Sequence, residues 1–382
     1  MNKEIKELYC ISCGEKYPID EYYKGCPSCY EKGHPSSLSI AYKNKFVINA
    51  EKKGLSRYES HLPFLESEIV SLGEGKTSLV SLEVLASKLG LKKLYSKNEF
   101  QNPSGSHKDR MNSFFIPRAI DANYDNVAAA SSGNQGVSLA LYAAAAKINC
   151  LIVATKSINP FWKMAIESTG AEIVYTETFM ERWEYIKKRI QEGNVITSTN
   201  VIDPPIGSNP FGVQGYKVIS YELYEEMTDG LADYILVPNS RGDLIWGIYE
   251  GFVDLRDGGY ISKIPKLIAV EPFPRLGKVE NIEDCVNHYD GDYSQTPSIG
   301  GDTVTVQSYL AVKNSGGYSI SVDKERVLEA ISIMSENGLY LEDSSAVSIC
   351  CLDELVKLGL IKEGSNVVMI STSHGFKNEV RG

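Results

Sequence analysis

The chain has 382 residues, of which 43% are hydrophobic and 23% are charged, a composition typical of a folded globular protein. Its formal net charge is −10 and no basic block stands out, which argues against a large surface for nucleic acid or an anionic membrane. The N-terminal segment lacks the apolar core of a secretory signal, and the most apolar stretches are too short to span a bilayer. We therefore expect a cytoplasmic protein that binds neither nucleic acid nor membrane.

Four of the eight cysteines lie near the N-terminus in the pattern C-x2-C-x12-C-x2-C. They are Cys10, Cys13, Cys26 and Cys29. Two such pairs offer four thiolates to one tetrahedral zinc ion, and this zinc would be structural because no coordination position stays open for catalysis. A disulfide framework is disfavoured in a reducing compartment. A redox C-x-x-C pair and four unrelated cysteines remain as alternatives.

In chain order, a cysteine-rich module at 1–45 is followed by a charged linker at 51–64. Short apolar runs then alternate with helical patterns. Strands are predicted at 92–100, 126–132, 150–156, 171–177, 232–240, 266–273 and 365–373, and helices at 108–123, 134–148 and 160–170. Near-continuous apolar strands separated by helices are typical of parallel sheets that are covered on both faces. The predicted fold class is therefore α/β, open-sheeted and doubly wound.

Four polar loops follow predicted strands, at the edge where open α/β sheets bind ligands. They occupy 101–109, 131–136, 239–243 and 371–375. In the second loop, a helix begins within S-S-G-N-Q-G, and backbone N–H groups at a helix N-terminus bind anions. This loop can hold a carboxylate or a phosphate through Ser131, Ser132, Gly133, Asn134 and Gln135. A helix cap with a tight turn is the alternative explanation.

The loop at 239–243 repeats this layout, with Ser240, Arg241 and Gly242 between a strand and a helix. Backbone donors, a hydroxyl and a fixed positive charge suit a phosphate. Asp243 would repel that phosphate unless it pairs with Arg241 or caps the helix. The glycine patterns of ATP-binding and dinucleotide-binding loops are both absent.

Lys108 follows an N-P-S-G-S turn at the end of a predicted strand. No full glycine pattern precedes it, so it is not a phosphate-loop lysine, and most lysines are plain surface charges. A lysine that is partly desolvated at such an edge can form a Schiff base. This placement points to a carbonyl cofactor that carries a phosphate.

With these loops in this order, the chain resembles the fold-type II pyridoxal-phosphate enzymes of the tryptophan synthase beta superfamily, and within them the threonine synthase family. The resemblance runs over nearly the whole length and rests on residues 72–110, 130–136, 237–252 and 371–378. It implies two open doubly wound domains and a small zinc-ribbon-like module at 1–45. The catalytic region would span 46–382, with the smaller subdomain, roughly 95–200, inserted in the larger one.

The resemblance also implies roles for individual residues. Lys108 would be the catalytic lysine bonded to the cofactor, Asn134 would contact the cofactor's phenolate oxygen, and Thr372 would face its pyridine nitrogen. The cofactor's phosphate would bind Ser240, Arg241, Gly242, Asp243 and Leu244. The substrate carboxylate would bind Ser131, Ser132, Gly133 and Gln135. Pyridoxal 5'-phosphate and a structural Zn2+ are the expected cofactors, and a homodimer is the expected assembly.

The implied activity is elimination or replacement on an amino acid with an activated side chain, with O-phosphohomoserine converted to threonine. A neutral hydroxyl at the pyridine nitrogen favours elimination over transamination or decarboxylation. Departures from the family pattern bear on the substrate: His107 replaces an apolar residue, Gln135 a threonine, and Gly212 an arginine that helps to bind the substrate's phosphate. Glu342 resembles a residue that lines the site, or is a solvated helix-end carboxylate.

Alternative reactions in the same class are β-replacement on O-phosphoserine, as in cysteate synthases, and threonine or serine dehydration. A different class of function is a binding or regulatory protein with this fold and no catalysis. If the protein is an enzyme of this family, its small-molecule partner would be an amino-acid substrate.

Overall fold

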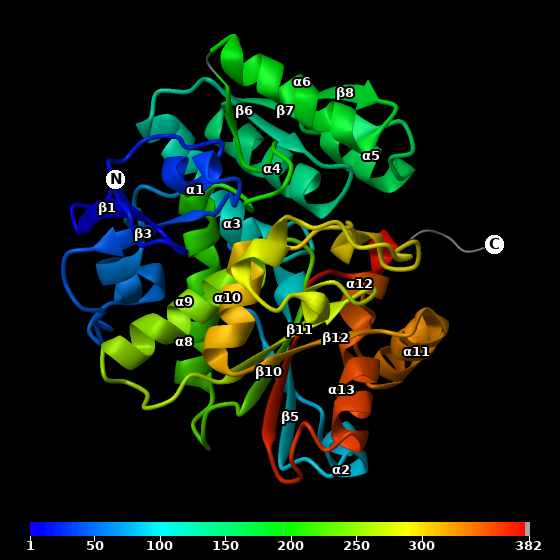
Figure 1. The fold of residues 1–382 in the computed structure, drawn as a ribbon. Coiled ribbons are helices and arrows are strands. Elements are labelled where there is room, and N and C mark those ends of the chain that lie inside the picture. The colour runs from blue at the N-terminus through cyan, green and yellow to red at the C-terminus, as the bar shows by residue number, and fades with distance from the viewer. Residues whose placement is uncertain (194, 379–382) are drawn as a thin grey trace. The chain divides into compact units, whose positions relative to one another are not determined.

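The computed structural model describes residues 1–193 and 195–378 of the chain. The chain folds into two compact units (Figure 1). Unit 1 comprises Met1–Glu74 and Lys108–Val218, whereas unit 2 comprises Gly75–His107 and the chain from Ile219 onward. Each unit thus joins two separate stretches of sequence, and one change of unit falls at the peptide bond between His107 and Lys108.

The N-terminal part of unit 1 is a three-stranded antiparallel sheet in the order β2-β1-β3. Its strands are β1 (Ile5–Cys10), β2 (Lys16–Tyr17) and β3 (Leu38–Tyr42). The short helix α1 (Pro27–Glu31) begins with a proline, which suits the first helical position. Cys10 ends β1 and Cys26 caps α1, so regular structure holds both cysteine pairs.

The rest of unit 1 surrounds a four-stranded parallel sheet in the order β8-β7-β6-β9. Its strands are β6 (Asn126–Ala130), β7 (Asn149–Thr155), β8 (Glu172–Thr176) and β9 (Ile196–Thr197). Its helices are α3 (Lys108–Asp121), α4 (Asn134–Ala146), α5 (Pro160–Glu167), α6 (Phe179–Gln191) and α7 (Pro210–Val213). The predicted strands and helices of this region are confirmed. Only two residues long, β9 has no periodicity that a sequence could reveal.

Alternate residues of this sheet point into two separate clusters of buried side chains. Val127 and Ala129 of β6 pack with residues of α3, α4 and α5. Ala128, between them, packs on the other side with Trp183 and Ile186 of α6. Both faces of the sheet are therefore covered, which is the doubly wound arrangement that the apolar strands predict.

Unit 2 contains a six-stranded sheet in the order β12-β11-β10-β13-β5-β4. Its strands are β4 (Leu79–Ser81), β5 (Lys93–Lys97), β10 (Tyr234–Pro238), β11 (Lys266–Glu271), β12 (Tyr318–Ser321) and β13 (Asn366–Ile370). All pairs are parallel except β4 with β5. The sequence predicts the four inner strands, whereas the two edge strands, β4 and β12, are short and escape it.

The helices of unit 2 cover this sheet. They are α2 (Glu83–Lys88), α8 (Lys217–Glu226, which begins at the unit boundary), α9 (Asp243–Asp257), α10 (Val306–Ser315), α11 (Val327–Glu336), α12 (Asp343–Ala346) and α13 (Ser348–Lys357). Leu236, Ile268 and Met369 pack with α2, α11 and α13. The predicted α/β class is confirmed. Within the described part of the chain, no helix is long and apolar enough to cross a membrane.

Candidate active site

Lys108 is the first residue of α3 and is half-buried. Its Nζ lies 5.9 Å from the centroid of the Tyr216 ring, in the 3-10 turn Gln214–Tyr216. Its carbonyl oxygen accepts a hydrogen bond of 3.3 Å from Asn112 Nδ2. An amine that is withdrawn from water beside an aromatic ring is chemically suited to react as a nucleophile.

Asn112 connects α3 to α4. Besides the Lys108 carbonyl, its Nδ2 reaches Ser138 Oγ at 2.8 Å, and its Oδ1 accepts from Gln135 Nε2 at 3.0 Å. Gln135 Nε2 also donates to Ser198 Oγ at 3.0 Å. The Gln135 amide nitrogen is therefore turned into the interior of unit 1 and is fully used there. What this residue can offer a substrate carboxylate is its backbone N–H near the start of α4.

The residues before α4 form a capped turn. Ser131 Oγ accepts from the N–H groups of Gly133 and Gly136, at 3.3 and 3.1 Å. A Cβ at Gly133 would lie 3.2 Å from the Trp162 ring, so glycine fits this crowded turn best. Asn134, the first residue of α4, is 8% exposed. The helix cap that the sequence allows is thus present, and it leaves the N-terminus of a 13-residue helix at the carboxyl end of β6.

Ser132 bonds to neighbouring elements of unit 1. Its Oγ accepts from the Thr155 N–H at 3.0 Å and from Arg182 Nη1 at 3.2 Å, and it lies 3.3 Å from Thr155 Oγ1. These contacts use both lone pairs and the proton of the hydroxyl. Arg182, on α6, is a residue that the sequence analysis missed, because nothing in the local pattern distinguishes it from the other charged residues of that helix.

In unit 2, the loop between β10 and α9 is fixed by the segment that leads into α10. Ser240 Oγ donates to the Gly300 carbonyl at 2.9 Å. The Arg241 carbonyl accepts from Thr305 Oγ1 at 2.7 Å and from Gln307 Nε2 at 2.8 Å. These contacts hold the backbone of the loop in place ahead of a 15-residue helix, whose N-terminus is a general anion-binding feature.

Gly242 is the residue that this loop cannot exchange. Its φ is +80°, a left-handed conformation that favours glycine, and a Cβ there would lie 2.5 Å from Ser308 Cβ. Asp243, the first residue of α9, accepts from Gln307 Nε2 at 2.6 Å. Burial lowers the pKa of the Arg241 guanidinium, and the Asp243 carboxylate opposes that change. Asp243 is therefore held by Gln307, and its charge acts on the buried Arg241 guanidinium. Leu244 is buried behind it.

Two further residues of this loop region escaped the sequence analysis. Asn239, directly after β10, is 1% exposed, and its side-chain Nδ2 and Oδ1 have no hydrogen-bond partner within the described structure. Arg275 is fully buried, pairs with Glu271 at 3.1 Å and donates to the Asn239 carbonyl at 2.9 Å. An unsatisfied buried amide is costly. The Asn239 amide, together with the N-terminus of α9, therefore fits a site that receives a polar group such as a phosphate.

Thr372 lies in the loop after β13, and its backbone is held on both sides. Its N–H donates to Ser345 Oγ at 2.7 Å, and its carbonyl accepts from the His107 N–H at 2.9 Å. His107 Nδ1 also lies 3.3 Å from that carbonyl. The His374 N–H donates to the Gly105 carbonyl at 3.1 Å. Neighbouring strands β10, β13 and β5 are parallel, so Ser240–Leu244, Thr372 and the residues before Lys108 share one edge of the sheet.

Glu342 is only 5% exposed, so its alternative description as a solvated carboxylate is wrong. Its N–H donates to the Ser373 carbonyl at 3.0 Å, and its carboxylate accepts from Ser298 Oγ. It therefore lies beside the Thr372 loop and helps to fix that loop.

The four N-terminal cysteines converge on one point. All four Sγ atoms lie within 4.8 Å of one another, with 3.6 Å between Cys10 and Cys29 and 3.8 Å between Cys13 and Cys26. The N–H groups of Cys13 and Cys29 reach Cys10 Sγ and Cys26 Sγ, both at 3.4 Å, contacts that stabilise thiolates. The four cysteines can thus bind a metal, which rules out four unrelated residues, and no disulfide joins cysteines in the described part of the chain.

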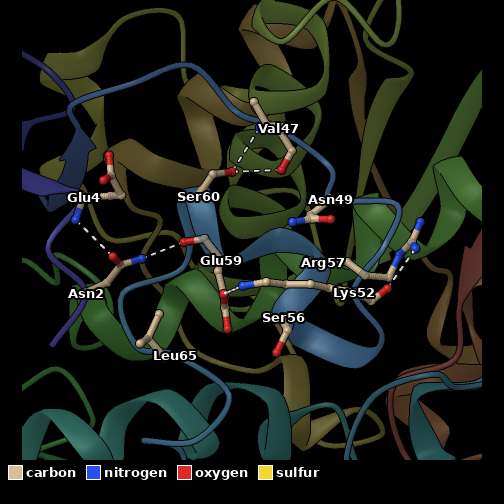
Figure 2. Close-up of a pocket in the computed structure, with 10 residues that line it drawn as sticks. All are labelled: Asn2, Glu4, Val47, Asn49, Lys52, Ser56, Arg57, Glu59, Ser60 and Leu65. Carbon is tan, nitrogen blue, oxygen red and sulfur yellow. Dashed lines mark hydrogen bonds and ion pairs between the residues drawn. The ribbon is translucent and has the colours of Figure 1, made fainter.

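A separate cavity of about 310 Å³ lies near the N-terminus (Figure 2). It is lined by Asn2, Glu4, Val47, Asn49, Lys52, Ser56, Arg57, Glu59, Ser60 and Leu65. These polar groups bind one another: Lys52 pairs with Glu59, whose carbonyl also accepts from Asn2 (Figure 2). None of the residues predicted for catalysis or cofactor binding lines this cavity.

Comparison with known proteins identifies the class. Residues 70–373 match the family model described as pyridoxal-phosphate dependent enzyme. Solved structures with a similar fold include threonine deaminase isoform 2 from Solanum lycopersicum and an L-serine ammonia-lyase from Rhizomucor miehei. The threonine deaminase has a TM-score of 0.66 and 19% identity, and the match covers 79% of each chain. The ammonia-lyase has a TM-score of 0.65 and 20% identity, and the match covers 78% of this chain and 94% of that one. The chain belongs to the pyridoxal-phosphate-dependent enzymes of fold type II.

Within this family, the chain is similar to threonine synthases. It is 30% identical to the threonine synthase of Methanocaldococcus jannaschii over 97% of this chain and 92% of that protein. It is 27% identical to the threonine synthase of Methanosarcina acetivorans with the same coverage. The protein is therefore a pyridoxal-phosphate-dependent lyase that is threonine synthase-like, and a purely binding or regulatory role is not supported.

Proposed function

We propose that this enzyme converts O-phosphohomoserine and water to threonine and inorganic phosphate. The observation that carries the proposal is Lys108, half-buried at the start of α3, in a chain similar to archaeal threonine synthases over almost its full length. β-Replacement on O-phosphoserine and dehydration of threonine or serine are the competing reactions.

The cofactor would be held from several loops. The N-terminus of α9 and Arg241 would bind its phosphate, with Ser240, Asp243 and Leu244 completing the loop around Gly242. The unsatisfied Asn239 amide supports a polar occupant beside this loop. Asn134 would contact the ring's phenolate oxygen. When bound, pyridoxal phosphate supplies the sink for the electrons released from the substrate's Cα–H bond.

The remaining chemistry falls to this chain's own residues. The Lys108 amine would act as the base that takes the α-proton. A neutral hydroxyl at Thr372, beside the pyridine nitrogen, would not hold a proton there as a carboxylate would, which suits prompt loss of the phosphate leaving group. The substrate carboxylate would bind the Ser131 hydroxyl and the backbone N–H groups of Ser132 and Gln135 at the start of α4, with Gly133 between them in the same turn.

A direct test uses the visible absorption of the purified protein. We expect a yellow protein whose band is abolished by borohydride, and a Lys108→Ala variant that lacks the band and loses at least about a hundredfold in activity, because general-base catalysis alone contributes that much. Lys163→Ala is the matched control, since Lys163 is an exposed lysine of the same unit. A colourless wild-type protein that rejects added pyridoxal phosphate would contradict the proposed function.

Product assays choose among the reactions. Phosphate release from O-phosphohomoserine with formation of threonine supports the proposal. Release only from O-phosphoserine, or ammonia and a keto acid from threonine, would assign the enzyme to one of the competing reactions instead.

We further propose that the ion at the four cysteines is a structural Zn2+, because four thiolates in tetrahedral reach are its preferred ligands. A homodimer, a cytoplasmic location and the boundaries of the ribbon module and the inserted subdomain remain predictions from the sequence.

A further inference from the structure

Arg182 places a permanent positive charge against the loop that precedes α4. Its Nη1 donates to Ser132 Oγ at 3.2 Å, and its Nε lies 3.4 Å from the Phe179 carbonyl. The guanidinium also stacks on the Phe179 ring, with 4.1 Å from Cζ to the centroid. Only 5% of Arg182 is exposed, so the side chain is fixed in one place rather than sweeping through solvent.

The Arg182 guanidinium lies at the carboxyl edge of the four-stranded sheet. Ser132 follows β6, Thr155 ends β7, and α6 begins three residues after β8. Three adjacent parallel strands therefore deliver Ser132, Thr155 and Arg182 to the same carboxyl edge. In open α/β sheets, ligands bind outside this edge.

The hydrogen-bond donors of the loop before α4 suit a carboxylate, which carries one negative charge, better than a phosphate dianion. The hydroxyl of Ser132 and the amide nitrogen of Gln135 are already engaged within unit 1. Backbone N–H groups and the Ser131 hydroxyl remain for a carboxylate. A phosphate dianion is held far better by a guanidinium, which can donate two parallel hydrogen bonds.

Position 212 in α7, where the resemblance leads one to expect a phosphate-binding arginine, has no room for such a side chain. A Cβ at Gly212 would lie 2.9 Å from Met111 Cγ and 3.2 Å from the Met111 carbonyl oxygen. A long side chain there would therefore have to displace α3.

We infer that Arg182 is the specificity-determining residue that binds the side-chain phosphate of the substrate. This inference rests on the proposed function, because it concerns the substrate of the same site. Ser132 then has the role of a positioning residue that aims the guanidinium.

The experiment compares three variants of the full-length enzyme loaded with pyridoxal phosphate. Arg182→Gln removes the charge but keeps a donor for Ser132, and Arg182→Lys keeps the charge without the planar fork. Arg189→Gln is the control, because Arg189 lies on the exposed side of the same helix and pairs with Glu192 at 3.1 Å. The phosphorylated amino acids O-phosphohomoserine and O-phosphoserine are compared, as substrates and as ligands, with threonine and serine as unphosphorylated ligands. Binding of inorganic phosphate is measured by calorimetry.

We expect Arg182→Gln to raise KM for the phosphorylated substrates and to weaken phosphate binding by at least about tenfold, as loss of a charge-assisted hydrogen bond does. Binding of threonine and serine should change little. Arg182→Lys should be intermediate, and Arg189→Gln should match wild type. An equal loss for all four amino acids, or no loss at all, would overturn the inference.

Failure of the inference is distinguishable from failure of the proposed function. If wild-type enzyme turns over only unphosphorylated substrates and binds no phosphate, both fail. If it releases phosphate from O-phosphohomoserine and Arg182→Gln does so with unchanged KM, only the role of Arg182 is wrong.

Discussion

Gly212 and Gly215 bring the backbone of the segment at 210–216 directly against α3. A Cβ at Gly215 would lie 1.9 Å from the Arg110 carbonyl oxygen, whereas one at Gly212 would lie 2.9 Å from Met111 Cγ. Arg110 and Met111 follow Lys108 by two and three residues. These glycines therefore help to set the position of the first turn of α3, where Lys108 begins the helix.

The two glycines give a graded prediction at the scale of single residues. Gly215→Ala should lower the free energy of unfolding by more than Gly212→Ala, because a backbone carbonyl cannot move aside as a methionine side chain can. Overpacking of this kind costs about 1–3 kcal/mol, and Gly215→Ala should lie at or above the upper end. Urea denaturation of the two variants and the wild type measures the difference. Equal stability of both variants would show that α3 shifts freely.

Among the secondary-structure elements, β5 and α8 are joined by a buried cation. Lys97 is fully buried at the end of β5, and its Nζ reaches Glu222 Oε2 at 2.8 Å and Glu226 Oε2 at 2.9 Å. The same Nζ donates to the Thr77 carbonyl at 2.8 Å. One ammonium group thus uses its three protons on α8 and on the chain entering β4. These contacts fix the strand that leads to the loop before Lys108.

Removal of this cation should be strongly destabilising. Lys97→Met leaves two carboxylates close together and partly buried, a change that costs about 3–5 kcal/mol. The control is Lys187→Met, which removes an exposed ion pair with Glu184 on α6 and should cost no more than about 0.5 kcal/mol. Chemical denaturation of both variants gives the comparison. A loss as small as that of the control would mean that the cluster adds nothing to stability.

Across the molecule, the cysteine module is part of unit 1 rather than a loose appendage. Glu21 Oε1 accepts from Arg118 Nε at 2.7 Å, and its Oε2 accepts from Asn209 Nδ2 at 3.0 Å. Burial raises the pKa of Glu21, and Arg118 opposes the change. Farther along the module, Ser39 Oγ accepts from Gln214 Nε2 at 3.2 Å. The module therefore contacts α3 near its end and the glycine-containing segment that packs on its start.

Metal removal tests this arrangement on the whole protein. Chelation should make the four module cysteines reactive toward a thiol reagent and lower the thermal unfolding midpoint, because binding energy of a structural metal is folding energy. The other four cysteines, all buried, serve as the internal control and should stay unreactive in the native protein. Chelation that leaves the module cysteines protected would contradict the metal site.

Much of the fold follows from the sequence alone. Strands β10, β11 and β13 of unit 2 and β7 of unit 1 are mainly apolar and buried on both faces, and such runs are detectable because burial demands them. Edge strands β4, β9 and β12 have two to four residues and carry no detectable period. The polar loops at strand ends, Lys108 and the cysteine pairs are likewise predictable, because each is recognised from the spacing of nearby residues.

Contacts between distant residues are what only the tertiary structure decided. That Gln135 turns its amide nitrogen inward toward Asn112 and Ser198, or that Gln307 engages Asp243, depends on residues 23 to 64 positions apart in the chain. Arg182 looks like any charged helix residue until the sheet brings it to Ser132. Local sequence specifies which groups are present, because propensity and spacing act over a few residues. Which of those groups remain available to a ligand is decided by long-range packing.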